Sequence, residues 1–499
     1  MSRASAFSNY QQSMGLFSRD MVGLPLYPYQ SEWADYVLRL VAERRNEIIV
    51  VEMPRQSGKN ETSAQLEVAI LARHGKLGGD IVKCAPTWKP QIVNSKLRFD
   101  ARSGMAARRL PFLRFKPTMG YIYSCGRASI SFLSAGPEAS VVGATASLLM
   151  EVDEAQDVDK AKFEKDFSPM RASTAAPVVA YGTTWTDDTL LESFKQEVSE
   201  GRSAGRCFRI LPETVAEANP AYGDFVDSEI RRKGRDHPLI KTQYFLEPLP
   251  RMGRLLNDQK LRLMVGSHAR SEARSGEAQI VAGLDFAGAD ESAGEMIGLS
   301  TGSERDSVAL SIGRVDWINV ADGVAEPVLR ILDRYEWVNV RPESLHTTLY
   351  QILWEKWRVN RVHCDGTGIG ATSTAFLAAA LNKGATERVH AVVFDGALVS
   401  HTRLAFRYIA AVNGSRLLDY QPGFDAVEVA HQDAPNTHDP HRHIWWQRGH
   451  AKLEAKPGKK VKVYVPESEG HDDLMIADML CLDAAYEAQQ PIGDLVDFA

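Results

Sequence analysis

The chain has 499 residues, of which 44% are hydrophobic and 24% charged, and its formal net charge is −6; this predicts a soluble protein of two domains with a connector. The acidic balance argues against non-specific coating of DNA, although local basic patches can still bind phosphates. No apolar run approaches the roughly 18 residues that cross a bilayer, and we expect no secretory signal. The five cysteines form no C-x-x-C pair, which argues against disulfides or a cysteine zinc site and for a reducing cytoplasm.

The first 210 residues alternate between predicted helices and strands. Residues 32–43 place apolar side chains on one helical face, and a second helix is predicted at 60–73. Short apolar strands are predicted at 48–51, 80–84, 130–133, 147–152 and 178–181. Strands that alternate with helices imply a parallel sheet with covered faces. We therefore expect an α/β domain over residues 1–210.

The rest of the chain divides into a linker and a second domain. Residues 211–275 are charged and show no run of buried strands, so we expect a helical linker with a hinge near 271–276. Strands resume beyond the hinge, and a helix from 472 to about 487 ends the pattern. The second α/β domain is thus expected over residues 276–499, with strands at 280–285, 308–312, 328–332, 362–365 and 392–394.

A phosphate-binding loop is predicted between the first strand and the helix at 60–73. Backbone N–H groups at a helix N-terminus face a phosphate, a glycine lets the backbone come close, and a lysine adds charge. Met53 replaces the first glycine of the P-loop pattern G-x-x-x-x-G-K-[ST], and an asparagine that can offer its amide oxygen to Mg²⁺ replaces Ser/Thr. The candidate nucleotide-binding residues are Arg55, Gln56, Ser57, Gly58, Lys59 and Asn60.

Two acids end the strand at 147–152, about 95 residues after the loop. Asp153 is expected to hold Mg²⁺ through water, and Glu154 to polarise the attacking water. A charged residue inside this strand, Glu151, departs from the apolar pattern. The paired loop and acids predict a nucleoside triphosphatase.

Two more polar segments accompany this site. Small polar residues follow the strand at 178–181, where they could sense the γ-phosphate or form an ordinary turn: Gly182, Thr183 and Thr184. Gln30, after Tyr29, could read the edge of adenine or cap the helix that follows. The sequence leaves both pairs of alternatives open.

Aspartates at the ends of elements predict a cation site in the second domain. Asp285 and Asp365 end strands, Asp472 and Asp473 open the last helix, and Asp306 precedes the strand at 308–312. Each could simply cap its element, but together they favour a site for Mg²⁺ or Mn²⁺, which prefer oxygen ligands. Two such ions stabilise both the attacking and the leaving oxygen at a phosphodiester.

Histidines and lysines cluster near the C-terminus. His431, His438, His441 and His443 lack regular zinc spacing, so we expect a solvated loop there. Residues 447–462 predict a basic hairpin around Pro457-Gly458 that could bind DNA phosphates or form a solvated face. Its cations are Arg448, Lys452, Lys456, Lys459, Lys460 and Lys462.

In this order, the motifs resemble those of the large terminase subunit of tailed bacteriophages. The loop from Pro54 to Asn60 is similar to the deviant Walker A motif of that family, and Asp153-Glu154-Ala155 to its Walker B motif. Gly182-Thr183-Thr184 looks like its coupling motif, and Tyr29-Gln30 like its adenine-reading motif. Three further segments resemble the acidic motifs of its ribonuclease-H-like nuclease: Gly283-Leu284-Asp285-Phe286, Cys364-Asp365-Gly366 and His471-Asp472-Asp473-Leu474.

The resemblance implies a RecA/ASCE-like ATPase domain followed by a ribonuclease-H-like nuclease domain. It implies ATP and Mg²⁺ in the first site, and a pair of Mg²⁺ or Mn²⁺ ions in the second. The implied partners are double-stranded DNA, a small terminase subunit and the procapsid portal, with a homo-oligomeric ring when docked and no membrane. The implied location is the host cell cytoplasm, outside the mature virion. Arg55 is a candidate γ-phosphate sensor, and Arg98, Arg108 and Arg109 are candidate arginine fingers.

Two other functions compete with this interpretation. A helicase–nuclease of DNA repair should carry a second RecA-like domain, and none is visible between Thr184 and Asp285. A non-catalytic assembly factor could use ATP only to change its shape. Substitution of Glu154 separates this last option, because a true motor should still bind nucleotide and lose turnover.

Overall fold

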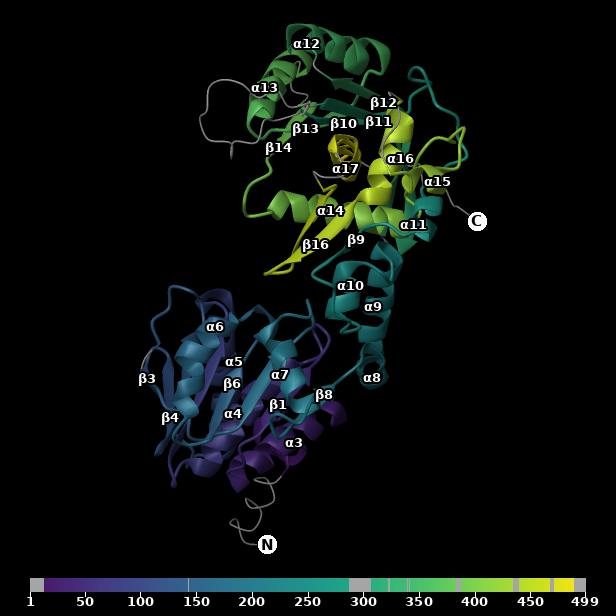
Figure 1. Cartoon of the computed structure of the whole chain (residues 1–499). Helices are drawn as coiled ribbons and strands as arrows, with labels where there is room; N and C mark the ends of the chain where they lie inside the picture. Colours follow the sequence, from purple (N-terminus) through teal and green to yellow (C-terminus); the bar gives the residue numbers. More distant parts are fainter. Residues whose placement is uncertain are drawn as a thin grey trace. The chain divides into compact units, whose positions relative to one another are not determined.

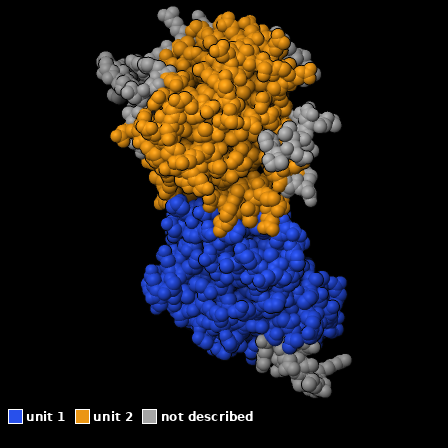
Figure 2. All heavy atoms as spheres, turned by 90° about the vertical axis from the view of Figure 1, so that its right-hand side faces the viewer, with its two compact units in different colours: residues 1–226, 241–250 blue, residues 227–240, 251–499 orange. Residues whose placement is uncertain are grey.

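The computed structural model describes residues 13–141, 143–286, 307–321, 324–338, 340, 342–382, 387–433, 439–466 and 471–488. The chain divides into two compact units: unit 1 holds residues 1–226 and 241–250, and unit 2 holds residues 227–240 and 251–499 (Figure 2). The predicted linker is divided between them, and its assignment as a separate functional part stays a prediction. None of the described helices combines the length and apolar character of a membrane-spanning segment.

Unit 1 is built on an eight-stranded sheet (Figure 1). Six neighbouring strands run parallel, and a meander of two antiparallel strands extends one edge. In sheet order the strands are β3 (Phe115–Met119), β4 (Ile122–Cys125), β5 (Ala128–Ser134), β2 (Gly79–Ala85), β6 (Leu149–Val152), β7 (Val178–Gly182), β1 (Ile48–Glu52) and β8 (Gly205–Arg209). Its helices include α2 (Met14–Phe17), α3 (Pro28–Glu43), α4 (Lys59–His74), α5 (Val93–Arg109), α6 (Lys160–Lys162) and α7 (Leu190–Ser199).

The strand order confirms the predicted RecA/ASCE-like arrangement. Strand β7 lies between β1, which leads into the phosphate loop, and β6, which leads into the paired acids. The central strands are buried along their whole length, because helices cover a parallel sheet on both faces. Loop and acids therefore meet at the carboxyl edge of one sheet, where ligands of open α/β sheets bind.

Unit 2 contains a six-stranded mixed sheet. In sheet order it runs β14 (Val389–Val392), β13 (Arg361–Asp365), β10 (Gln279–Asp285), β11 (Ser307–Ala321), β12 (Val324–Val338) and β15 (Leu417–Leu418). β10 is antiparallel to β11 and parallel to β13. This mixed sheet fits the second α/β domain that the resemblance implies. A small second sheet joins β17 (Lys460–Tyr464), β16 (Lys452–Lys456) and β9 (Met252–Arg254).

One long helix, α17 (Asp473–Tyr486), packs on the sheet of unit 2. Most of its residues are buried, and Gly283 of β10 permits the closest approach, since a Cβ there would overlap the backbone of Ala477 and Cys481. Other helices described in the two units include α8 (Pro212–Ala218), α9 (Pro220–Lys233), α10 (Pro238–Gln243), α11 (Asp258–Leu263), α12 (Pro342–Tyr350), α13 (Ile369–Leu381), α14 (Val399–Asn413), α15 (Ala426–Ala430) and α16 (Pro440–His450).

Candidate functional site

Two side chains at the start of α3 hold the phosphate loop by hydrogen bonds. The Tyr29 hydroxyl and the Gln30 amide both donate to the carbonyl oxygen of Ser57, at 3.0 and 2.9 Å. Gln30 also accepts the backbone N–H of Tyr27 at 2.9 Å, so it caps α3 as well as holding the loop. Gly58 has a φ of +91°, and a Cβ there would overlap the Gln30 amide. Both features explain why glycine stands immediately before the lysine.

Lys59 lies between the two acids that end β6. Its Nζ is 2.7 Å from Oε1 of Glu154 and 3.8 Å from Oδ1 of Asp153. Burial alone would lower the pKa of Lys59, but the Glu154 and Asp153 carboxylates outweigh it and raise the pKa. The ammonium is therefore firmly charged at neutral pH, and its counter-charges are the residues expected to handle Mg²⁺ and the attacking water.

Gln156 links these acids to the next strand, and the sequence did not single it out. Its Nε2 donates to Oε2 of Glu154 at 2.7 Å, while its Oε1 accepts the backbone N–H of Thr183 at 3.2 Å. A Cβ at Gly182 would overlap that same amide oxygen. The predicted coupling segment thus contacts the candidate catalytic glutamate through one side chain. A polar residue two positions beyond the paired acids was the available signal.

Asn60 offers an oxygen that fits a cation. Its Oδ1 is buried and has no hydrogen-bond partner among the residues that the structure describes. A buried amide oxygen without a partner is costly unless a ligand satisfies it. The position directly after Lys59 is where a P-loop protein presents its Mg²⁺ ligand. Asn60 and Asp153 are therefore the residues of this chain that fit the nucleotide-bound Mg²⁺.

The other predicted residues of this site lie at the rim of the loop or beneath it. Arg55 and Gln56 are exposed, and Arg55 donates to Oε1 of Gln243 at 3.1 Å. The Thr184 hydroxyl donates to Glu52 at the end of β1. Thr184 therefore ties the end of β7 to the strand that leads into the phosphate loop.

The candidate arginine fingers lie on or near the surface of α5. Arg98 is 3.8 Å from a Glu61 carboxylate oxygen, and Arg109 donates to the carbonyl oxygen of Met21 at 3.2 Å. Arg108 is exposed. Which of them, if any, serves a neighbouring subunit stays a prediction.

The charged residue inside β6 belongs to a buried polar cluster. Glu151 accepts hydrogen bonds from the Tyr181 hydroxyl at 2.6 Å and the Ser63 hydroxyl at 3.0 Å. Lys83 pairs with Glu67 at 2.7 Å beside them. Burial, with repulsion from Glu67, raises the pKa of Glu151 to about 8. Burial thus favours the protonated form of Glu151, which helps a glutamate to fit an otherwise apolar strand.

The predicted metal-binding aspartates of unit 2 gather at the end of two neighbouring strands. Asp285 and Asp365 end β10 and β13, which are parallel neighbours, and Asp473 begins α17 on the same sheet. Burial and then the carboxylates of Asp473, Asp365 and Asp472 raise the pKa of Asp285 well above its ordinary value. Mutual repulsion of this kind is what a divalent cation relieves.

Asp473 and Asp472 occupy different surroundings. Asp473 accepts a hydrogen bond from the Ser307 hydroxyl. Its repulsion is, after burial, the largest cause of the raised pKa of Asp285, whereas Asp472 contributes least. Burial and repulsion from Asp473 raise the pKa of Asp472 to about 6. These contacts favour Asp473 as the third ligand, with Asp472 beside it. Asp306 lies outside the described residues.

A separate His–acid group lies toward the other end of α17. Among the described residues, it is the group of three whose ligand atoms lie within 4.8 Å of one another: His363, Asp483 and Glu487. Two guanidinium groups pair with Asp483, however, at Arg403 (3.1 Å) and Arg407. A cation would have to compete with these arginines, so the contacts describe an ion-pair network. Among the described residues, the predicted aspartates do not meet this distance.

Four fully buried charges anchor α17 to the rest of unit 2. Asp478 of α17 pairs with Arg334 of β12 at 2.9 Å and with Arg448 of α16 at 2.7 Å. Asp419 pairs with the same two arginines, each at 2.7 Å. Because each of the two carboxylates pairs with both guanidinium groups, all four of these charges have partners of opposite sign.

The region predicted as a histidine-rich loop and basic hairpin divides differently. Asp439 caps α16 and Pro440 begins it, so His441 and His443 are helical and the predicted solvated loop is wrong for them. Arg448 is likewise buried in α16 and not part of a DNA-facing hairpin. His438 lies outside the described residues. The hairpin itself is confirmed as β16 and β17, which carry or adjoin Lys452, Lys456, Lys459, Lys460 and Lys462; DNA binding by its lysines stays a prediction.

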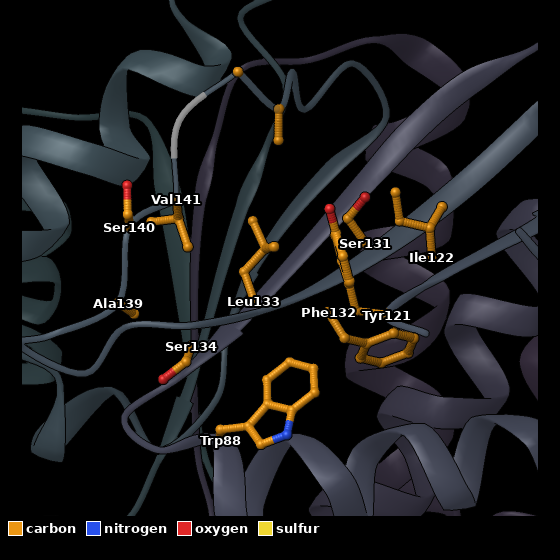
Figure 3. A pocket seen from close by; sticks show the side chains of 12 residues that line it. Trp88, Tyr121, Ile122, Ser131, Phe132, Leu133, Ser134, Ala139, Ser140 and Val141 are labelled. Carbon is orange, nitrogen blue, oxygen red and sulfur yellow. The ribbon is translucent and has the colours of Figure 1, made fainter. Parts of the chain in front are cut away.

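The hollows of unit 1 that lie away from the phosphate loop include two of about 490 and 600 Å³. The first lies beside the second half of β5 and is lined by Trp88, Tyr121 and Leu133 (Figure 3). The other, of about 600 Å³, lies at the end of α4 and is lined by both apolar and basic side chains, including Lys76 and Lys116. Neither holds any of the residues predicted from the motifs.

No family model and no curated protein matches this chain. Similar solved structures include the large terminase from a thermophilic bacteriophage, with 9% identity, a TM-score of 0.48 and coverage of 92% of this chain and 98% of that chain. The HK97 bacteriophage large terminase has 14% identity, a TM-score of 0.39 and coverage of 95% and 99%. The ATPase domain of the Thermus phage P74-26 large terminase has 16% identity, a TM-score of 0.36 and coverage of 46% and 96%.

Proposed function

We propose that this chain is the large subunit of a phage terminase. It hydrolyses ATP to move double-stranded DNA into a procapsid, and it cuts concatemeric DNA with a metal-dependent endonuclease. The observation that carries the proposal is the placement of Lys59 between Glu154 and Asp153, at the carboxyl edge of a sheet in RecA/ASCE-like order. The gathered aspartates of unit 2 support the second activity.

The contacts in unit 1 support a specific order of events. Without nucleotide, the Lys59 ammonium neutralises Glu154 at 2.7 Å. A triphosphate attracts this ammonium to its β- and γ-phosphates, which frees the carboxylate to accept a proton from the attacking water. Asn60 and Asp153 would hold Mg²⁺, which would neutralise charge on the phosphates. Gln156 orients the Glu154 carboxylate through one hydrogen bond and links it to the backbone of Thr183 through another.

The contacts in unit 2 support a nuclease with a fixed set of oxygen ligands. Asp285, Asp365 and Asp473 would hold two divalent cations, which supply charge for the attacking and leaving oxygens of a phosphodiester. The residues themselves position that site: Ser307 holds Asp473, and the N–H of Thr367 donates to Asp365 at 2.8 Å. The DNA strand would approach along the β16–β17 hairpin, whose lysines can bind phosphates.

The proposed role implies partners and a place of action. A small terminase subunit would deliver the DNA, and the procapsid portal would receive this chain as a homo-oligomeric ring in the host cytoplasm. Double-stranded DNA would be both cargo and nuclease substrate. ATP turnover that rises with added double-stranded DNA would support this coupling.

The test compares Lys59→Ala and Asp285→Ala with the wild type in two assays on the full chain. Lys59→Ala should lower ATP turnover at least ~100-fold, because an unpaired phosphate charge is costly, and should leave Mn²⁺-dependent plasmid cleavage within about threefold. Asp285→Ala should abolish plasmid cleavage and leave ATP turnover within about threefold of wild type. Each variant is therefore the control for the other. Unchanged ATP turnover in Lys59→Ala, or unchanged cleavage in Asp285→Ala, would refute the corresponding half. Glu154→Ala should bind nucleotide and not hydrolyse it; retained turnover would refute its assigned role.

A further inference from the structure

The sheet of unit 2 places a fourth acidic side chain level with the aspartates. In the strand register, Asp285 of β10 is paired with Ala309 of β11, which is paired with Glu336 of β12. Directly paired residues of antiparallel strands point to the same face, so Asp285 and Glu336 share a face and lie two strands, about 10 Å, apart. Helix α17 packs on this face, because Ser311, two residues beyond Ala309, donates to Asp478.

Helix α16 brings a histidine to the same place. His443 contacts both carboxylate oxygens of Glu336 through Nδ1, at 2.9 and 3.0 Å. The side chains are 17% and 11% exposed, so the pair is neither sealed in the core nor free in solvent. Nε2 of His443 makes no hydrogen bond within the described part of the chain, which leaves one ring nitrogen available to a ligand.

The pair lies within electrostatic reach of the candidate metal ligands. Glu336 raises and His443 lowers the pKa of Asp473, after the larger effects of burial, Ser307 and His471. The charged side chains that act on Asp473 therefore include Glu336 from β12, His443 from α16 and His471 just before α17. His443 itself contacts Glu336 and lies 5.9 Å from Trp446 of its own helix, between ring centroids.

We propose that His443 is a further catalytic residue of the nuclease site, with Glu336 as its positioning residue; this rests on the proposed nuclease function. A carboxylate that binds Nδ1 fixes the orientation of an imidazole and presents Nε2 for proton transfer. The water oxygen forms a bond to phosphorus, and the bond from phosphorus to the leaving oxygen breaks. The leaving oxygen takes the Nε2 proton of the His443 imidazolium, and solvent then returns a proton to Nε2. The attacking water loses its own proton to solvent.

The test measures cleavage of duplex DNA by the full chain with Mn²⁺, at saturating metal. His443→Ala should slow cleavage about 100-fold or more, as for loss of a general acid, and Glu336→Gln should slow it less. ATP turnover should stay within about threefold of wild type, which confines the loss to unit 2; recovered cleavage of a duplex with a sulfur leaving atom then shows that unit 2 is still folded. His431→Ala is the matched control, because His431 is an exposed histidine of unit 2 that pairs with Asp258.

A second substrate separates proton transfer from a structural role. A duplex with sulfur in place of the leaving oxygen needs no proton at that atom, since a thiolate leaves unaided. On this substrate, cleavage of the modified bond by His443→Ala should return to within about tenfold of wild type. Equal loss on both substrates would overturn the proton-donor role, and cleavage of ordinary DNA within threefold of wild type would overturn any catalytic role. A wild-type chain that cuts no DNA would instead refute the nuclease itself.

Discussion

At the scale of single residues, Gln156 joins the proposed catalytic glutamate to the end of β7. Its amide is held at both ends, by the Glu154 carboxylate at 2.7 Å and by the backbone of Thr183 at 3.2 Å. A change in the position of the glutamate would therefore reach the end of β7 through this one side chain. Thr184, which follows Thr183 in the chain, donates to Glu52, so the chain of contacts continues into β1.

We expect Gln156→Ala to uncouple this contact while leaving nucleotide binding intact. The loss of a partner that orients a catalytic group commonly costs 10- to 100-fold, so kcat for ATP should fall by roughly 10-fold or more. The dissociation constant for a non-hydrolysable ATP analogue should change less than about threefold, because Lys59 and the loop keep their contacts. Gln196→Ala, at an exposed glutamine of α7, is the control. A weakened affinity with unchanged kcat would contradict this role.

The residues named in the motifs could be predicted from the sequence, but not their partners. The loop, the paired acids and the aspartates at strand ends each leave a local pattern in the chain. Glu336 and His443 do not: they lie 107 residues apart and meet only because β12 and α16 flank α17. Glu151 could be recognised as unusual from the sequence, whereas its raised pKa depends on Glu67, which lies on another element.

At the scale of elements, the position of α17 sets where Asp473 lies relative to the other candidate metal ligands. It begins with Asp473, is fixed in the middle by the buried charges around Asp478, and ends in the ion pairs of Asp483. Gly283 of β10 sets how near it can come to the sheet, because backbone atoms of the helix occupy the space of a Cβ. Asp285 lies two residues beyond that glycine, on the same face of the strand.

Gly283→Ala should therefore displace α17 and separate Asp473 from Asp285. Overpacking costs typically 1–3 kcal/mol, and backbone atoms cannot rotate away as a side chain can. We expect DNA cleavage to fall at least ~100-fold, as when a catalytic group is displaced by about 1 Å, while ATP turnover stays near wild type. Gly396→Ala is the control in unit 2, since a Cβ there meets nothing within 4 Å. Cleavage within threefold of wild type would show that the helix contact is not limiting.

Regular, buried elements could be predicted from the sequence, and polar or partly exposed ones could not. The central strands of unit 1 were predicted to within a few residues, since apolar runs between turn residues mark buried parallel strands. β8 was missed because only Phe208 of its residues is buried. β11 and β12 each extend to 15 residues, well beyond the predicted apolar segments, because their mutual pairing carries polar residues that no apolar pattern marks.

At the scale of the whole molecule, the two proposed activities belong to units that have separate sheets and separate cores. The core of unit 1 includes Val50, Val152 and Ala180 from three neighbouring strands. The core of unit 2 includes Leu284 and Cys364, beside the candidate metal ligands. Since each site is built on its own sheet, a ligand of one site should stabilise chiefly the unit that holds it.

We expect calorimetry of the full chain to resolve two unfolding transitions with different ligand responses. A non-hydrolysable ATP analogue with Mg²⁺, at ~100 times its Kd, adds about 2.7 kcal/mol to the unit that binds it. For a unit of roughly 150–250 residues this raises one Tm by about 5–11 °C. Lys59→Ala should abolish that increase, and Gly283→Ala should lower only the other transition. A single transition that nucleotide raises and Gly283→Ala lowers alike would mean that the two units unfold together, and that the sites share one cooperative structure.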